Sequence, residues 1–202
     1  MGRPPRRLLD RETIVRAGLD LVDAHGADAL SVNRVAAELG VKGPSLYNYI
    51  SGRDDLVDGI RELIVAEMEL DLTVTPWTAT LDAWARSYRA AFGAHPKAVP
   101  LLVARPIRSP GALRAYAVAF AGLREAGWPE HRVLPVVWAV ECFLLGAALT
   151  AGPPVVAAAP DDPPPGVEAL FDAGPKEFDA AFETGLAALI RGLAFELDGL
   201  LR

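Results

Sequence analysis

The chain of 202 residues is 51% hydrophobic, has a formal net charge of −6 and contains one cysteine. This composition predicts a globular protein, and it excludes a disordered chain, an internal disulfide and a multi-cysteine metal site. Because no secretory leader pattern and no run of about 20 uninterrupted apolar residues is found, we expect a cytoplasmic protein.

The charge is unevenly distributed. Residues 1–53 hold eight Lys and Arg against six Asp and Glu, whereas the remainder holds twelve against twenty. A basic end that can approach phosphate is therefore joined to an acidic body. Residues 1–10 are expected to form a flexible basic arm, since Arg3, Arg6 and Arg7 flank two prolines that disfavour a helix.

Three helices are predicted over residues 11–52. Apolar residues recur at helical spacing over 11–25, and two short helices follow over 32–39 and 43–50, separated by a turn at Gly40. These lengths are typical of a helix-turn-helix, in which the second helix enters the major groove of DNA. The second short helix leaves an unusually polar face, made of Lys42, Ser45, Tyr47, Asn48 and Tyr49.

Only helical periods follow. Residues 53–70 predict a connecting helix, and the body over 71–202 contains further helical segments at 77–94, 97–104, 109–126, 130–151 and 176–201. Seven of the 17 prolines lie in 152–175, which predicts a mobile loop there. The predicted fold class is all-α, with an N-terminal helix-turn-helix domain and a helical C-terminal domain that binds a ligand and dimerises.

The sequence resembles the tetracycline-repressor family of bacterial regulators through AAELGV at 36–41, PSLYNYI at 44–50 and RDDL at 53–56. The resemblance implies that Tyr47 and Arg53 hold DNA phosphates. It also implies that four side chains face the groove: Lys42, Ser45, Asn48 and Tyr49. The chemistry agrees for Asn48, whose amide can pair bidentately with adenine.

Two residues at the front of the 32–39 helix are further candidates for phosphate contacts. A hydroxyl at Ser31 and a cation at Arg34 would lie where helix N-terminal amides face the DNA backbone. Helix capping for Ser31 and a solvated surface position for Arg34 are the alternatives.

A weaker resemblance covers the body, through HPK at 95–97, RP at 105–106 and FETGL at 182–186. It implies that helices 130–151 and 176–201 pair with their copies in a homodimer. The expected interface is the apolar stripe of Phe182, Leu186, Leu189, Leu193 and Leu197, although a core-facing helix of a monomer would show the same stripe. Residues 136–149 are apolar nearly all round, which favours contacts on two sides.

A cavity for a small organic effector is expected in the body. Its candidate aromatic lining residues are Trp84, Tyr88, Tyr116, Phe120 and Trp138, and ordinary core packing is the favoured alternative for each of them individually. Glu141 either binds a ligand or pairs with an arginine across the dimer, and Arg105 is a ligand candidate with a surface role as alternative. Cys142 is expected to be an inert core thiol.

Tetracycline repressors themselves hold a magnesium–drug complex through a histidine and a glutamate. Those positions align with Leu101 and Thr150 here, so no metal site and no cofactor is expected. We therefore expect a repressor that leaves a palindromic operator when it binds a small organic ligand.

Two other functions compete with this one. The first is a dimeric DNA-binding protein that senses no ligand, which the sequence leaves open. The second is an all-helical enzyme, which would need a nucleophile with its base, a metal set or a phosphate loop. None of these is evident, and the three histidines lie in separate segments without ligand spacing, so the chain is expected not to be an enzyme.

Overall fold

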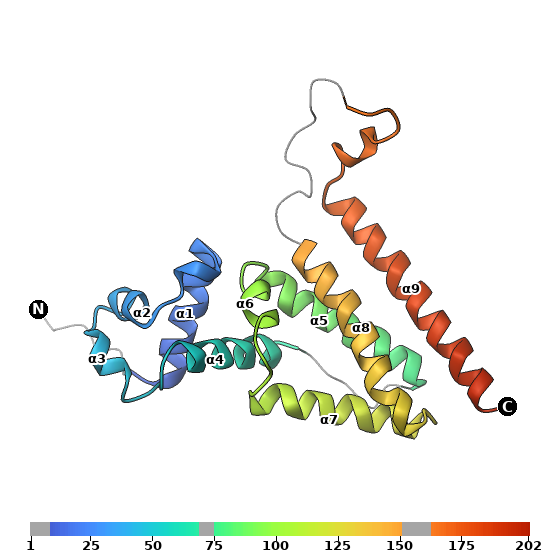
Figure 1. The fold of residues 1–202 in the computed structure, drawn as a ribbon, viewed down its shortest axis with the longest axis horizontal. Helices are drawn as coiled ribbons and strands as arrows, with labels where there is room; N and C mark the ends of the chain where they lie inside the picture. The colour runs from blue at the N-terminus through green and yellow to red at the C-terminus, as the bar shows by residue number, and fades with distance from the viewer. Residues whose placement is uncertain (1–8, 69–74, 151–162) are drawn as a thin grey trace, which may run out of the picture.

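The computed structural model describes residues 9–68, 75–150 and 163–202. Every regular element in those ranges is a helix, which confirms the predicted all-α class. Figure 1 shows a small N-terminal head and a larger body of longer helices, joined through one helix. Residues 1–8 of the predicted arm and residues 152–162 of the predicted loop lie outside the described residues.

The head contains three α-helices, α1 (Arg11–His25), α2 (Val32–Glu38) and α3 (Gly43–Leu46). Side chains cap the first two, because the Asp10 carboxylate accepts from the Thr13 amide at 2.8 Å and the Ser31 hydroxyl accepts from the Arg34 amide at 3.3 Å. The apolar faces of the helices meet in one core, which includes Ile14, Val22, Val35 and Leu46. This packing fixes the angle between α2 and α3.

The turn between α2 and α3 requires a glycine at position 40. Gly40 has a φ of +67°, a left-handed conformation that side-chain-bearing residues rarely adopt. At Gly43 an added Cβ would lie 2.7 Å from Oδ1 of Asn33, so the exposed Asn33 side chain would have to move to admit it. The turn predicted at Gly40 therefore depends on a backbone conformation that favours glycine.

The second helix of the motif is shorter than predicted. Regular α3 ends at Leu46, and residues 47–49 continue as a turn in which the amides of Tyr49 and Ile50 both donate to the Leu46 carbonyl. Leu46 and Ile50 are buried, as predicted.

One helix, α4 (Arg53–Ala66), connects the head to the body. It packs against α1 on one side and against α5, α6 and α7 of the body on the other. Gly59 allows the contact with α1, because a Cβ at this position would lie 2.6 Å from Cγ2 of Val15. A displacement of α4 would therefore involve both parts of the molecule.

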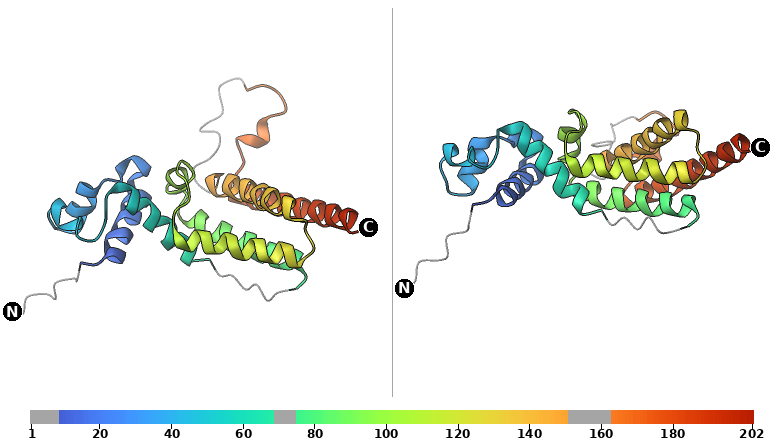
Figure 2. Two further views of the ribbon diagram at one scale, coloured as in Figure 1. Left: turned by 60° about the horizontal axis from the view of Figure 1, so that its bottom comes forward. Right: turned by 90° about the horizontal axis from the view of Figure 1, so that it is seen from below.

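The body contains α5 (Trp77–Ala94), α6 (Val99–Val103), α7 (Pro110–Glu125), α8 (Glu130–Thr150) and α9 (Pro175–Leu200). A short 3₁₀ turn, Glu168–Leu170, lies before α9. α5 packs against α8 and α9, while α7 packs against α4 and α8. Figure 2 shows α8 and α9 together on one side of the body, with α5 and α7 beneath them.

The apolar helix α8 is long enough and hydrophobic enough to cross a membrane by composition alone. In the structure it is a central body helix that contacts α5, α6, α7 and α9. Its buried residues lie on one face, as the core of a globular protein requires: Val133, Val136, Val137, Val140, Leu144 and Ala148.

Candidate DNA interface and effector cavity

The turn after α3 presents polar side chains to solvent. Lys42, Asn48 and Tyr49 are exposed, and Tyr47 is 58% exposed, while Ser45 is partly covered. Since Leu46 and Ile50 fill the core beneath them, these groups are displayed on a rigid base. Four of the five residues predicted to contact DNA are therefore exposed in and around α3.

Ser31 caps the start of α2, which was the alternative to a phosphate contact for this residue. Its hydroxyl caps the helix by accepting from the Arg34 amide at 3.3 Å. The Arg34 side chain is exposed. A phosphate contact stays a prediction for both, because a capping hydroxyl can still donate its own hydrogen.

Arg53 is engaged within the head, which its sequence position did not indicate. Its Nε donates to the Leu30 carbonyl at 3.0 Å, and one terminal nitrogen donates to the Ala27 carbonyl at 3.5 Å. The guanidinium thus joins the start of α4 to the segment between α1 and α2. A phosphate contact through the remaining donors of the guanidinium stays a prediction for Arg53.

His95 and Lys97 attach the body to the end of α1. The imidazole Nδ1 of His95 lies 2.6 Å from the Asp23 carboxylate, and its Nε2 lies 3.4 Å from Glu67 after α4. The Lys97 ammonium donates to the carbonyls of Asp23 at 2.7 Å and Ala24 at 3.0 Å, where a cation stabilises a helix C-terminus. The head and body are therefore in contact beside α4 as well as through it.

The prediction that Arg105 contacts a ligand is wrong. Its guanidinium pairs with Asp54 in the first turn of α4, and the side chain lines neither cavity described below. The sequence alone does not reveal this pairing, because Asp54 is distant from Arg105 along the chain. Arg105 is thus another link between body and connecting helix.

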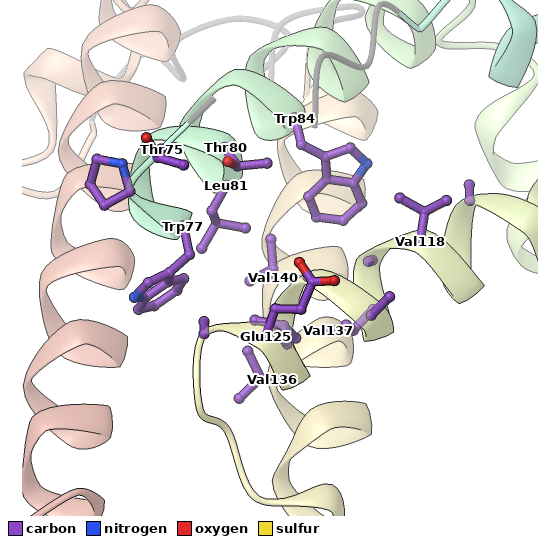
Figure 3. Close-up of a pocket in the computed structure, with 17 residues that line it drawn as sticks. Thr75, Trp77, Thr80, Leu81, Trp84, Val118, Glu125, Val136, Val137 and Val140 are labelled. Carbon is purple, nitrogen blue, oxygen red and sulfur yellow. The ribbon is translucent and has the colours of Figure 1, made fainter. Parts of the chain in front are cut away.

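A cavity of about 610 Å³ lies between α5, α7 and α8 (Figure 3). This volume is within the range typical of small-molecule sites. The lining is mostly apolar, with Trp77, Leu81 and Trp84 from α5 facing Val136, Val137 and Val140 from α8. We call it the apolar cavity.

A smaller cavity of about 50 Å³ adjoins it, and we call it the polar cavity. The two share the lining residues Trp84, Ala115, Ala119 and Val137. The polar cavity is also lined by four side chains with hydrogen-bonding or charged groups: Arg61, Tyr88, Tyr116 and Glu141. Three of the predicted ligand contacts, Tyr88, Tyr116 and Glu141, therefore lie around one space.

Hydrogen bonds organise the polar cavity. The Tyr116 hydroxyl donates to the Glu141 carboxylate, so this carboxylate has a partner within its own protomer. Burial raises the pKa of Tyr88 and Tyr116, and the adjacent Glu141 raises both further. Both phenols are therefore protonated at neutral pH and can act as donors.

Arg61 was missed by the sequence analysis. Arg61 is only 7% exposed. One terminal nitrogen of its guanidinium donates to the carbonyls of Leu102 at 2.7 Å and Arg105 at 3.3 Å. Its Nε has no hydrogen-bond partner. The available signal was its spacing, since Arg61 follows Val57 by four residues on the apolar face of α4.

Two aromatic predictions for the cavity are wrong. The Trp138 side chain is 56% exposed and points away from both cavities, because it lies on the opposite face of α8 from Val136, Val137 and Val140. Phe120 packs edge-on against Tyr116 at 6.0 Å and lies beneath the Arg124 guanidinium, outside both linings. Trp84 is the aromatic residue that lines both cavities.

The predicted dimer interface on α9 is also misplaced. Phe182, Leu186, Leu193 and Leu197 are buried within the protomer, and Leu189 is partly buried against the same core. Phe182, for example, stacks on Phe143 of α8 at 5.5 Å. The alternative, a stripe facing the protomer's own core, is therefore correct.

A different apolar surface is exposed on α8 and α9. On α8 it comprises Leu134, Trp138, Cys142 and Leu149, and on α9 it comprises Ala181, Ala188, Gly192, Phe195 and Gly199. Phe195 is 81% exposed. We call this surface the α8–α9 band; the expectation of a core thiol at Cys142 is wrong, because this residue is exposed there.

The magnesium site of tetracycline repressors does not fit this chain. Leu101 is a buried hydrocarbon side chain, and the Thr150 hydroxyl donates to the carbonyls of Gly146 and Ala147. Within the described ranges, no group of three or more His, Cys, Asp or Glu residues is placed to hold a metal ion.

Comparison with known proteins places both parts of the chain. Residues 14–60 match the family described as bacterial regulatory proteins, tetR family, and residues 73–158 match the tetracyclin repressor-like C-terminal domain. The tetracycline repressor protein class A from transposon 1721 of Escherichia coli is 32% identical over 203 residues, covering 92% of this chain and 91% of that protein.

Two further relatives are informative. The transcriptional repressor DrrR1 of Streptomyces coeruleorubidus is 31% identical over 149 residues, which is 73% of this chain but only 55% of that protein. The crystal structure of apo ActR from Streptomyces coelicolor superimposes with a TM-score of 0.76 at 26% identity, covering 95% of this chain and 98% of that one.

Proposed function

The chain belongs to the tetracycline-repressor family of bacterial regulators, and from this premise we propose that it is a homodimeric DNA-binding repressor which an organic effector releases from its operator. The observation that carries the proposal is the connection of a polar helix-turn-helix face, by the single helix α4, to a body with a cavity of about 610 Å³. We also propose that it acts in the cytoplasm and catalyses no reaction.

On DNA, the exposed face of the head has two kinds of role. Asn48 and Lys42 have side chains suited to base edges, since an amide pairs with adenine and an ammonium reaches guanine or phosphate. Tyr47 offers a hydroxyl at the edge of the face, where it can donate to a phosphate. Ser45 and Tyr49 complete the surface that enters the groove.

These roles predict that two substitutions in the protein change its DNA affinity in different ways. The DNA is a duplex that the wild-type protein selects from a random pool. Asn48→Ala should relax the preference at one base pair per half-site by roughly tenfold, the worth of about 1–3 kcal/mol of base discrimination. Tyr47→Phe should instead weaken binding to every sequence about equally, because phosphate carries no base identity. Affinities across a panel of single-base operator variants measure both effects. An Asn48→Ala protein with unchanged preference at every position would contradict the groove assignment.

The second subunit covers the α8–α9 band. Exposed apolar residues lie on each of these two adjacent helices, and monomeric proteins seldom leave large apolar surfaces in water. Small residues at Ala188, Gly192 and Gly199 permit close helix approach, and Phe195 supplies apolar area beside them. Two heads held in one dimer can then contact two half-sites about one helical turn apart.

The effector acts through α4. Arg61 lies beside the polar cavity and also holds the carbonyls of Leu102 and Arg105, so a bound ligand contacts the helix that positions the head. A ligand shifts this equilibrium only by binding the DNA-free arrangement more tightly than the DNA-bound one. Occupied cavities therefore favour a head separation that no longer matches the two half-sites.

A further inference from the structure

Arg61 on α4 is a buried residue with a hydrogen-bonding capacity that the protein does not use. Its side chain is only 7% exposed, its Nε has no partner, and no ion pair joins it to a carboxylate among the described residues. Leaving a buried donor without an acceptor is costly, and native proteins rarely do so without a functional reason.

Arg61 lines the polar cavity, which has room for a small polar group. Its volume of about 50 Å³ is several times the roughly 10–15 Å³ that one water molecule needs. The Tyr88 and Tyr116 hydroxyls, both protonated, line the same space. The Arg61 guanidinium and the Tyr88 hydroxyl thus line a space with room for a carboxylate.

Glu141 is the opposing charge in this cluster. Its carboxylate accepts from the Tyr116 hydroxyl. The negative charges of Glu141 and of Asp58 on α4 both favour the charged form of the Arg61 guanidinium. An amine would be attracted by these carboxylates, whereas an acid would be attracted by Arg61. The Glu141 carboxylate already accepts from Tyr116, whereas the guanidinium has two carbonyl acceptors and no carboxylate, so an acid is the favoured ligand.

We propose that the effector is an aromatic organic acid, with its carboxylate bound by Arg61 in the polar cavity and its apolar ring system in the adjoining apolar cavity. This inference rests on the proposed function, since it names the chemical class of the effector. A guanidinium suits the role because it holds a carboxylate with charge-assisted hydrogen bonds. The shared wall of Trp84, Ala115, Ala119 and Val137 lets one molecule occupy both spaces.

Three fluorescent probes with one ring system test the proposal: anthracene carboxylate, anthracenemethanol and anthracenemethylamine. Their affinities for the full-length protein are measured by fluorescence polarisation. We expect the carboxylate to bind at least about tenfold more tightly than the alcohol, and the amine to bind most weakly, because a hydrogen bond between charged groups is worth about that factor. An alcohol as tight as the acid, an amine tighter than both, or no binding by any probe would overturn the proposal.

The Arg61→Met variant assigns the preference to one residue. It should bind the alcohol as the wild type does, which also shows that the cavity is intact, and it should lose the tenfold preference for the acid. If the preference persists in a folded Arg61→Met protein, the assignment fails. If this variant does not fold, the order of the three probes on the wild type still decides the proposal.

DNA binding is measured separately, so the two claims can fail independently. A dimer that binds DNA but ignores the charge of the probe would contradict the effector class and leave the repressor function standing. A protein that prefers the acid but binds no specific DNA would contradict the repressor function alone.

Discussion

Replacing Trp138 by glutamate should convert the protein into a monomer and weaken its binding to a two-half-site duplex by a hundredfold or more. The charge would lie in the α8–α9 band, where a carboxylate facing an apolar partner loses its hydration without gaining a counter-ion. A monomer contacts one half-site at a time and loses the effective concentration that linkage provides, which is worth about 10²–10⁴ in affinity.

Sedimentation velocity and operator titration measure the two effects together. The helix content should be unchanged by circular dichroism, since the Trp138 side chain is already 56% exposed in the protomer. Leu113→Glu is the matched control, because Leu113 on α7 is 52% exposed but lies outside the band, and this variant should remain dimeric. Cys142 adds a second readout, as its thiol should react with maleimide only in the monomer. A dimeric Trp138→Glu protein would place the interface elsewhere.

Replacing Ala119 by tryptophan should lower the affinity for anthracenemethanol by roughly a hundredfold. The indole would occupy space that the anthracene ring otherwise fills, and the ring would lose about 100 Å² of buried apolar contact area. Ala119 lines both cavities, so a side chain added there obstructs ligands in either one. The neutral probe is used so that the result does not depend on Arg61.

Ala117→Trp is the control for that experiment. Ala117 is exposed on the same helix and lines neither cavity, so the same indole should leave probe binding unchanged. Equal affinities in the Ala119→Trp and wild-type proteins would mean that ligands bind outside the cavity between α5, α7 and α8.

Helices and their order could be predicted from the sequence, because the signals are local. Apolar spacing, the cap at Ser31 and the stop at Gly26 define the first helices within a few residues, and α5, α8 and α9 follow from their periodicity. The exposed groups at Tyr47 and Asn48 were accessible by the same reasoning, since the apolar positions of a short helix identify its polar face.

The partners of those faces could not be predicted. Leu193 looks the same in sequence whether its stripe meets its own core or a second subunit, and the structure shows that it meets the core. Arg53 and Arg105 are occupied by contacts with residues distant in sequence, Leu30 and Asp54, which no local pattern reveals. Trp138 was misassigned because periodicity alone does not say which side of an all-apolar helix is inward.

The central claim is tested most directly by adding effector-like ligand to the protein bound to its own selected DNA. The measurement is the fluorescence anisotropy of a labelled duplex, chosen by the wild-type protein from a random pool, during titration with anthracene carboxylate. We expect the selected duplexes to contain two inverted half-sites about 10 base pairs apart, bound by one dimer, and the anisotropy to fall to that of free DNA as the ligand saturates the body. Selected DNA without two-fold symmetry would contradict the proposed repressor, and so would a ligand that fills the cavity yet leaves the DNA fully bound.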